Sequence, residues 1–331
     1  MRAMVMAAGL GTRLRPLTYE VPKPLVPVAN RPIMEHVLRL LARHGLGEVI
    51  ANLHWYPDTV RDRFGDGSKS GVELTYRYEP DLLGTAGGVR NVRDFLGSEP
   101  FLVMAADPLT DIDLGDLVRA HQAHGGMATL AVKRVANVSE YGVVITGSDG
   151  RVQGFQEKPD PAEALSDLAS CMIYVLEPEV FEHFPDQPVV DFALDVFPAL
   201  LDHGAPFYVH ETDAYWNDVG SIREYLQGNF DALTGAVAVD AAGGALEGGD
   251  EEEPVRTAAG WELSGRALVG EGAEIGQAVR LDGPVVVGPG ARIGGGACVK
   301  ESVLLPGVEI PAEAMLVGAI AGRRGWLVGR P

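Results

Sequence analysis

Residues 2–24 read RAMVMAAGLGTRLRPLTYEVPKP, and the fold of the chain starts from this stretch. The run before Gly9 is short and mostly apolar, which suits a buried strand. Gly9 and Gly11 allow tight backbone turns whose amide groups can hold phosphate oxygens. Arg13 adds a planar cation and Lys23 a mobile one. The stretch therefore predicts an anion-binding turn at the end of a buried strand.

This turn differs from two common nucleotide-binding loops. It lacks the Gly-Lys-Ser/Thr end of a P-loop, and it lacks the third glycine of a dinucleotide fingerprint. Two glycines standing alone would indicate only a plain turn. Its interpretation as a binding loop depends on the rest of the chain.

Strand-like and helix-like segments alternate from this stretch to about residue 235. Strands are expected over residues 2–8, 48–53, 71–78 and 101–106, and helices over residues 32–44 and 59–64. Pro32 suits the first turn of its helix and Gly45 suits its end. The order predicts a Rossmann-like α/β domain over residues 1–235, with a mainly parallel sheet covered by helices on both faces. Ligands of such sheets bind where strands end, and Gly9 and Asp107 both follow apolar strands.

The last part of the chain carries a six-residue repeat. Large apolar residues recur at Leu263, Val269, Ile275, Leu281, Val287, Ile293, Val299 and Leu305. Small or β-branched residues recur at Ala267, Ala273, Val279, Val285, Ala291, Ala297 and Val303. This pattern predicts a left-handed parallel β-helix of two to three coils over residues 261–331, against an alternative of short antiparallel strands. We expect so short a solenoid to pack on the first domain or on another subunit.

Residues 236–260 join the two domains. Alanine, glycine and acidic residues dominate there, which predicts a linker. Its acidic run at residues 250–253 is expected to be solvated.

Charge and hydropathy restrict the partners and the compartment. The formal net charge of −19 argues against nucleic acid and anionic membranes, so phosphate ligands would need a local group of cations. No apolar run approaches a membrane span, and the first residues do not suit a signal peptide, so we expect a cytoplasmic protein. Cys171 and Cys298 lack metal-type spacing and are expected to be free thiols.

Five motifs, in order, resemble those of the sugar-1-phosphate nucleotidyltransferases, the nucleotide-sugar pyrophosphorylases. The glycine-rich residues 9–24 resemble the family signature, and residues 83–88, Leu-Gly-Thr-Ala-Gly-Gly, resemble its nucleobase loop. The remaining three are Asp107 with Leu109-Thr110-Asp111, Glu157-Lys158-Pro159, and Tyr215-Trp216-Asn217-Asp218-Val219-Gly220. The resemblance implies a GT-A-like nucleotidyltransferase fold, and a β-helix after the catalytic domain is common in this family.

The resemblance also implies roles for individual residues. Arg13 and Lys23 would be catalytic, and Asp107 and Asp218 would hold Mg²⁺. Nucleotide binding would involve Ala8, Gly9, Gly11, Thr12, Arg13, Gly84, Thr85 and Gly87. Binding of the sugar phosphate would involve Gly142, Glu157, Lys158 and Ser170. The reaction would join a nucleoside triphosphate (NTP) to a sugar 1-phosphate and release pyrophosphate.

The choice of substrates is indicated less directly. Residues 83–88 resemble the version found in purine-using enzymes, and the whole chain is most similar to bacterial mannose-1-phosphate guanylyltransferases. GTP with mannose 1-phosphate is therefore expected first, and glucose 1-phosphate with another nucleotide is the main alternative. Ala106, Ser170 and Met172 depart from the family, which usually has glycine before the first aspartate and Asn-Ala-Gly in place of residues 170–172.

Three other functions compete with this one. A regulatory subunit would bind nucleotide sugars without turnover, but such relatives usually lose charged residues that are present here. An acyltransferase β-helix commonly uses a histidine base, and no histidine follows His210. A glycosyltransferase often carries an Asp-x-Asp metal motif, and Asp111 and Asp113 have that spacing. A homo-oligomeric enzyme remains the main expectation.

Overall fold

The computed structural model describes residues 1–249, 253–323 and 327–329. The chain divides into two compact units, and each combines segments far apart in the sequence. The first consists of Met1–Leu10 and Val37–Trp216, and the second of Gly11–His36 and Asn217–Pro331. The glycine-rich stretch is therefore shared, because the first unit contains Gly9 and the second contains Gly11.

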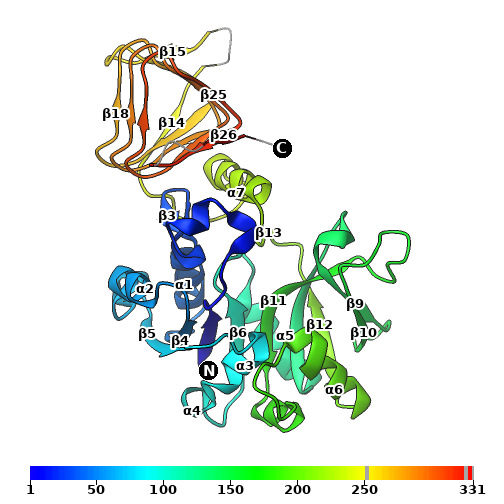
Figure 1. Cartoon of the computed structure of the whole chain (residues 1–331). Coiled ribbons are helices and arrows are strands. Elements are labelled where there is room, and N and C mark those ends of the chain that lie inside the picture. The colour runs from blue at the N-terminus through cyan, green and yellow to red at the C-terminus, as the bar shows by residue number, and fades with distance from the viewer. Residues whose placement is uncertain (250–252, 324–326, 330–331) are drawn as a thin grey trace. The chain divides into compact units, whose positions relative to one another are not determined.

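A mixed nine-stranded sheet forms the centre of the first unit (Figure 1). Its parallel part runs in the order β5-β4-β1-β6, so the expected Rossmann-like arrangement is present around the first strand. These strands are β1 (Ala3–Met6), β4 (Glu48–Leu53), β5 (Glu73–Tyr78) and β6 (Phe101–Ala105). Strand β4 has the predicted bounds. The other three are shorter than predicted, because the end residues of their apolar runs belong to loops.

The other half of the sheet contains antiparallel pairs. The long strand β11 (Leu168–Leu176) is antiparallel to β6, β8 and β9, and β12 runs parallel to β8. The strands are β8 (Ala128–Arg134), β9 (Gly142–Thr146), β10 (Val152–Glu157) and β12 (Phe207–Glu211), with the short β7 (Leu109–Thr110) and β13 (Trp216–Asn217) outside this sheet. No strands of this half are among those predicted from the sequence.

Helices cover the sheet and bury its apolar side chains. Helix α5 (Leu114–His124) packs against β8, β11 and β12, while α2 (Pro57–Phe64) packs against β5. The remaining helices of this unit are α3 (Thr85–Arg90), α4 (Arg93–Leu96) and α6 (Phe197–Asp202), preceded by a π-helical turn at Phe192–Val196. Aromatic rings of Phe101, Tyr174, Phe192 and Phe197 lie in the buried core.

Helix α1 (Ile33–Arg43) agrees with the predicted helix except at its first residue. Pro32 belongs instead to the two-residue strand β3 (Arg31–Pro32), which pairs with β2 (Pro27–Val28). The helix ends before Gly45, whose φ of 73° is a conformation that glycine adopts without strain.

The second unit contains the parallel β-helix that the repeat predicts (Figure 1). Three sheets form its faces, and equivalent strands of successive coils pair in parallel, which excludes the antiparallel alternative. The first face has β16 (Glu262–Ser264), β19 (Arg280–Asp282), β22 (Cys298–Lys300) and β25 (Met315–Val317). The second has β17 (Arg266–Val269), β20 (Val285–Val287), β23 (Val303–Leu304) and β26 (Ala319–Ala321). The third has β18 (Glu274–Ile275), β21 (Arg292–Ile293) and β24 (Glu309–Ile310).

The repeat loses one residue after Val299. Val287 pairs with Leu304, and Leu304 joins the buried interior of the β-helix. The prediction that Leu305 occupies this stacked position is therefore wrong. The coil is one residue shorter here, since Val286 pairs with Val303 rather than with the residue eighteen positions on.

Residues 236–260 are not a loose connection throughout. Strand β14 (Gly244–Glu247) pairs antiparallel with β17, and β15 (Val255–Arg256) pairs with β16. The first coil leaves backbone groups unpaired at its edge, and these two strands satisfy part of that edge. Of the acidic run, residues 250–252 lie outside the described residues, as do residues 324–326 and 330–331 of the predicted β-helix domain. Strand β27 (Leu327–Gly329) pairs antiparallel with β26.

The β-helix packs on helix α7 (Ile222–Thr234) through β17 and β20. Arg266 donates to the carbonyl of Thr234 at the end of this helix, at 2.8 Å. Because α7 lies within the predicted domain of residues 1–235, the expected packing of the solenoid on that part of the chain is observed.

Two further expectations can be compared with the described residues. Both cysteines are free, and burial raises the pKa of Cys171 to about 12. Within the described ranges, none of the helices has the length and apolar character needed to cross a bilayer.

Candidate functional site

The turn around Asp218 is held by hydrogen bonds from both of its sides. The Asn217 side chain accepts from the amide of Val219 at 2.8 Å, and the amide of Gly220 donates to the carboxylate of Glu224 at 3.1 Å. Ser221 caps the first turn of α7 by accepting from the Glu224 amide. This arrangement fixes the backbone that carries Asp218 just before a helix.

Two predicted cations converge on Asp218 within the second unit. Arg13 Nη2 lies 3.5 Å from Asp218 Oδ2, and Lys23 Nζ donates to the Asp218 carbonyl oxygen at 3.5 Å. The Arg13 side chain is 58% exposed, whereas that of Asp218 is 21% exposed. The structure thus brings three of the predicted reaction residues together, with the arginine open to solvent.

Gly11 shapes the chain just before Arg13. Its φ of 62° favours glycine, and an added Cβ would lie 2.9 Å from Thr18 Cγ2 and 3.0 Å from Lys23 Cβ. The Thr18 hydroxyl donates to the Gly11 carbonyl at 2.7 Å. Thr12 then opens the 3₁₀ turn Thr12–Leu14, which carries Arg13. Glycine is required here for close packing as well as for the turn.

In the first unit, Gly9 and Asp107 follow neighbouring parallel strands, as predicted. Ala8 and Gly9 come after β1, and Ala106 and Asp107 come after β6, with the Ala106 amide donating to the Met6 carbonyl at 3.1 Å. Ala106 is buried, so its methyl group is accommodated within the protein. Both strands end at the same edge of the sheet, which is where ligands of such sheets bind.

The predicted nucleobase loop is fixed against a second segment of the first unit. The amides of Ala86 and Gly87 both donate to the carbonyl of Val190, at 3.0 and 2.9 Å. Gly84 has a φ of 79°, and a Cβ there would lie 2.4 Å from the same oxygen. The absence of a side chain at Gly84 thus allows the Val190 backbone to approach closely.

Thr85 also has a partner within the protein. Its hydroxyl donates to Asp191 Oδ2 at 2.8 Å and accepts from the Phe192 amide at 3.0 Å. Asp191 in turn caps the π-helical turn by accepting from two amides. Thr85 therefore anchors the loop to the segment that begins at Val190.

The sugar-phosphate candidates lie on three adjacent strands of the first unit. Gly142 pairs with Glu157 across β9 and β10, and an added Cβ on Gly142 would lie 3.0 Å from Glu157 Oε2. Lys158 Nζ lies 3.5 Å from Glu157 Oε1, and both side chains are about half exposed. These two opposite charges thus lie side by side and accessible, and β9 separates their strand from β11, which carries Ser170.

Ser170 stands at an irregularity in β11. The pairing with β8 shifts between Ser170 and Tyr174, and Met172 has a φ of 54°. Ser170 Oγ accepts from the Met172 amide at 3.4 Å and lies 3.3 Å from the Tyr174 hydroxyl. Burial raises the pKa of Tyr174 well above its usual value. The serine hydroxyl therefore bonds within its own strand, where the related enzymes usually have asparagine.

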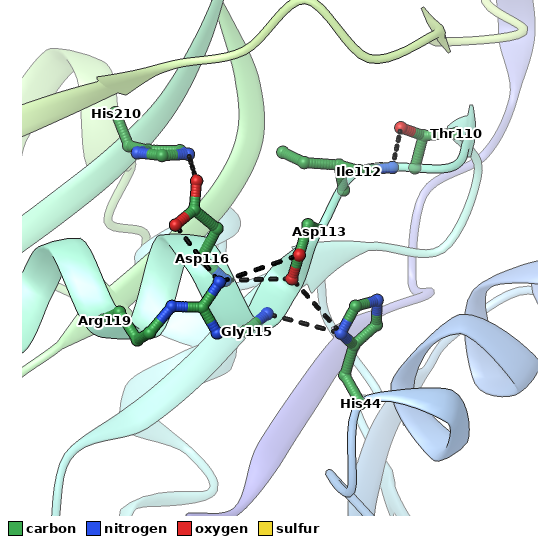
Figure 2. Close-up of polar contacts among 8 residues, drawn as sticks. All are labelled: His44, Thr110, Ile112, Asp113, Gly115, Asp116, Arg119 and His210. Carbon is green, nitrogen blue, oxygen red and sulfur yellow. Dashed lines mark hydrogen bonds and ion pairs between the residues drawn. The ribbon is translucent and has the colours of Figure 1, made fainter.

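The Asp-x-Asp spacing has a structural explanation, shown for Asp113 in Figure 2. Asp113 caps helix α5 by accepting from the Asp116 amide at 2.9 Å, and its carboxylate lies near His44 and Arg119. The amide hydrogen bond is the main cause of the lowered pKa of Asp113. Asp111 accepts from the Tyr215 amide at 2.9 Å. Both carboxylates thus have local partners, which removes the support for a glycosyltransferase metal motif.

Sequence reasoning missed a buried polar pair at the same sheet edge as Gly9. Asn52 is the next-to-last residue of the apolar strand β4, and Glu79 directly follows β5; they are 4% and 1% exposed. Asn52 Nδ2 donates to Glu79 Oε1 at 2.8 Å. A polar residue within the apolar run Val49–Leu53 was the available signal, but its partner is 27 residues away in sequence.

Comparisons with known proteins agree with this arrangement. The family described as "Nucleotidyl transferase" matches residues 2–235. A UTP–glucose-1-phosphate uridylyltransferase of Synechocystis is 35% identical over 96% of this chain and 86% of its own length. A mannose-1-phosphate guanylyltransferase of Mycobacterium tuberculosis is 36% identical over 90% of this chain and 82% of its own length.

A solved structure has the same fold over much of the chain. It is a putative glucose-1-phosphate thymidylyltransferase from Bacillus anthracis, with a TM-score of 0.63 at 23% identity. The match covers 69% of this chain and 94% of that one. The family match over residues 2–235, together with relatives that span nearly the whole chain, shows that this protein belongs to the nucleotidyl transferase family, as a sugar-1-phosphate nucleotidyltransferase.

Proposed function

We propose that this enzyme makes GDP-mannose from GTP and mannose 1-phosphate, with glucose 1-phosphate and another nucleotide as the alternative pair. The convergence of Arg13 and Lys23 on the Asp218 turn carries the reaction assignment, since it places one cation beside the Asp218 carboxylate and the other at the carbonyl of the same residue. Charged catalytic residues in such a cluster favour an active enzyme over a regulatory subunit.

The reaction requires positive charge more than a general base. A phosphate oxygen of the sugar 1-phosphate attacks the α-phosphorus, the new P–O bond forms, and the bond to the β-phosphate oxygen breaks. The electron pair of the broken bond leaves with pyrophosphate. The nucleophile is already an anion near neutral pH, so repulsion between anions dominates the barrier. In this proposal Arg13 holds the triphosphate and stabilises the leaving group, and Lys23 acts near the reacting phosphorus.

We further propose that Asp107 and Asp218 hold Mg²⁺. Their carboxylate oxygens are the ligand type that Mg²⁺ prefers, and the Asp218 turn is fixed on both sides. Bound there, the ion would neutralise charge on the phosphates. In the described parts of the chain, no group of three or more acidic, histidine or cysteine side chains has the arrangement of a metal site, so the phosphates and water would have to complete the coordination.

The remaining predicted residues bind the substrates in this proposal. The backbone of Ala8, Gly9, Gly11 and Thr12 holds the triphosphate, and the loop of Gly84, Thr85 and Gly87 faces the base. Lys158 holds the sugar phosphate and Glu157 a sugar hydroxyl, and the exposed charges of both residues support these roles. Gly142 leaves room beside Glu157, and Ser170 lies on the neighbouring strand.

The proposal also names the nucleotide and the sugar 1-phosphate that the enzyme uses. The purine-type sequence of residues 83–88 and the guanylyltransferase relative favour GTP with mannose 1-phosphate. The uridylyltransferase relative, equally similar and covering more of the chain, favours UTP with glucose 1-phosphate. Ser170 is shorter than the asparagine usual in the family and already bonds within β11, which favours a sugar contact different from the usual one. A cytoplasmic location and a homo-oligomeric state complete the proposal.

Pyrophosphate release tests the assignment. Purified protein with Mg²⁺ is incubated with GTP, ATP, UTP, CTP or dTTP, each with mannose 1-phosphate and with glucose 1-phosphate. We expect release only when both substrates are present, and fastest release from GTP with mannose 1-phosphate. Another fastest pair would overturn the proposed specificity, and tight nucleotide binding without release from any pair would support a regulatory subunit.

A matched pair of lysine variants tests the role of the cationic cluster. Lys23→Ala should lower kcat by roughly a hundredfold, as the loss of one charge-stabilising group does in other enzymes. Lys69→Ala removes an exposed lysine of the first unit and should leave kcat unchanged. Equal rates for the two variants would contradict the role proposed for Lys23.

A further inference from the structure

The buried pair of Asn52 and Glu79 connects two loops that the proposed function assigns to the nucleotide. Asn52 Oδ1 accepts from the Ala7 amide at 2.8 Å, directly before the phosphate-binding residues Ala8 and Gly9. Glu79 Oε1 accepts from Asn52 Nδ2 at 2.8 Å, and the Glu79 carboxylate also accepts from the amide of Leu83. Leu83 is the first residue of the predicted nucleobase loop.

The other end of the nucleobase loop also contacts this pair. Gly88, at the other end of the loop, packs so closely that an added Cβ would lie 2.7 Å from Asn52 Nδ2 and 3.0 Å from Glu79 Oε1. The backbone carbonyl of Glu79 is bonded as well, because His54 Nδ1 lies 2.8 Å from it. The first residue of the loop therefore bonds Glu79, and its last residue packs against both Glu79 and Asn52.

A buried carboxylate at this place needs an explanation. Removing a carboxylate from water is costly unless hydrogen bonds compensate, and burial raises the pKa of Glu79 while the bonds from Asn52 and Leu83 oppose that rise. An apolar pair of similar size would pack in this position without that cost. Directional hydrogen bonds, however, fix the loop backbone more narrowly than apolar contacts do.

We propose that Glu79 is a positioning residue that acts through Asn52 to hold the phosphate loop and the nucleobase loop in register for the NTP. This inference rests on the proposed function. The sugar-phosphate candidates lie on β9, β10 and β11, away from the bonds of this pair. Loss of the pair should therefore raise the KM for the NTP and leave the KM for the sugar 1-phosphate nearly unchanged.

A reciprocal exchange of the two side chains gives a sharp test. In Asn52→Asp, the new carboxylate still accepts from the Ala7 amide but loses its donor to Glu79. In the double variant Asn52→Asp/Glu79→Gln, the glutamine amide donates to the aspartate, and its oxygen accepts from Leu83. The hydrogen bond is thus restored with its direction reversed.

The kinetic outcome separates positioning from a purely structural role. Asn52→Asp should raise the KM for the NTP about tenfold, as expected for one lost buried hydrogen bond. The double variant should return it to within about threefold of the wild type. The control Thr129→Val removes a fully buried hydroxyl that bonds His121 outside the pair, and should change neither KM. Equal rises in both KM values, or a double variant no better than Asn52→Asp, would overturn the inference.

Hydrogen–deuterium exchange of the full-length chain tests the coupling between the two loops without requiring the protein to catalyse the reaction. Asn52→Asp should speed amide exchange in peptides covering residues 5–12 and 83–90 together, and the double variant should slow it again. If wild-type protein released no pyrophosphate from any substrate pair, the proposed function would be wrong. The exchange rates would still show whether the two loops are coupled. Faster exchange in one peptide alone, in an active enzyme, would reject the coupling and leave the proposed function intact.

Discussion

Gly220 is the residue on which the geometry of the cationic cluster depends most directly. A Cβ at this position would lie 2.7 Å from Asp218 Oδ2 and 2.8 Å from Arg13 Nη1. Because Asp218 Oδ2 is also the ion-pair partner of Arg13 Nη2, at 3.5 Å, one added methyl group must displace at least one of the two side chains. This lack of space for a Cβ explains why residue 220 is a glycine, and backbone flexibility is not needed as a reason.

Gly220→Ala should therefore impair the reaction more than the fold. We expect kcat/KM to fall on the order of a hundredfold, because a displacement near 1 Å in a reacting site has costs of that size. Steady-state pyrophosphate release measures the change, and a melting curve shows whether the protein remains folded.

The control for this substitution is Gly47→Ala, where an added Cβ meets nothing within 4 Å. It should leave both kcat/KM and Tm near the wild-type values. Wild-type activity in Gly220→Ala would mean that Arg13 and Asp218 tolerate displacement, which would count against the proposed cluster.

Among the elements, the β2–β3 hairpin links the cationic segment to the β-helix. The Tyr225 hydroxyl on α7 donates to the Pro27 carbonyl at 2.8 Å, and Asn229 accepts from the Ala29 amide at 2.9 Å. At the tip of the hairpin, Asn30 Nδ2 donates to the carbonyl of Val287 in β20 at 3.0 Å. The hairpin begins two residues after the 3₁₀ turn that carries Lys23, so this element anchors the end of that segment.

Asn30 also occupies a left-handed conformation, with a φ of 63°. Asn30→Gly keeps that conformation accessible and removes only the side-chain hydrogen bond, so it should lower the free energy of unfolding by about 1 kcal/mol. Asn30→Ala loses the bond and adds backbone strain, and should be less stable than the glycine variant. Thermal or urea unfolding ranks the two, and the reverse order would show that the bond to Val287 is not what Asn30 contributes.

At the scale of the whole molecule, the second unit is built from two separated parts of the sequence, Gly11–His36 and Asn217–Pro331. Segment Gly11–His36, helix α7 and the β-helix all belong to it. The β-helix therefore does more than extend the chain, because it packs on α7, whose first residues hold the Asp218 turn.

Deletion of residues 261–331 should consequently lower Tm by several degrees and reduce kcat/KM. The face of α7 that packs on β17 and β20 would become exposed, and the bond from Arg266 to Thr234 would be lost. Melting curves and size-exclusion chromatography compare the truncated and full-length chains, and Met315→Ser, at an exposed side chain of β25, serves as the control. Unchanged Tm and unchanged oligomeric size would contradict a stabilising or assembling role for the β-helix.

Much of the fold followed from the sequence alone, because its signals are local. Apolar runs of the right length predicted β1, β4, β5 and β6, and the six-residue repeat predicted a parallel β-helix. The order of five motifs identified the reaction class and the residues of the cationic cluster. Buried strands and coils repeat their apolar residues at a fixed period, and motifs consist of given residue types in a given order. Both features can be seen in a linear sequence.

Only the tertiary structure decided which distant residues become partners. It moved the stacked position from Leu305 to Leu304, and it placed the Val190 carbonyl beside Gly84. It also paired Asn52 with Glu79 and placed Gly11 in a different unit from Gly9. The physical reason is that hydrogen bonds and close contacts form between segments far apart in the chain, where sequence spacing carries no information about distance.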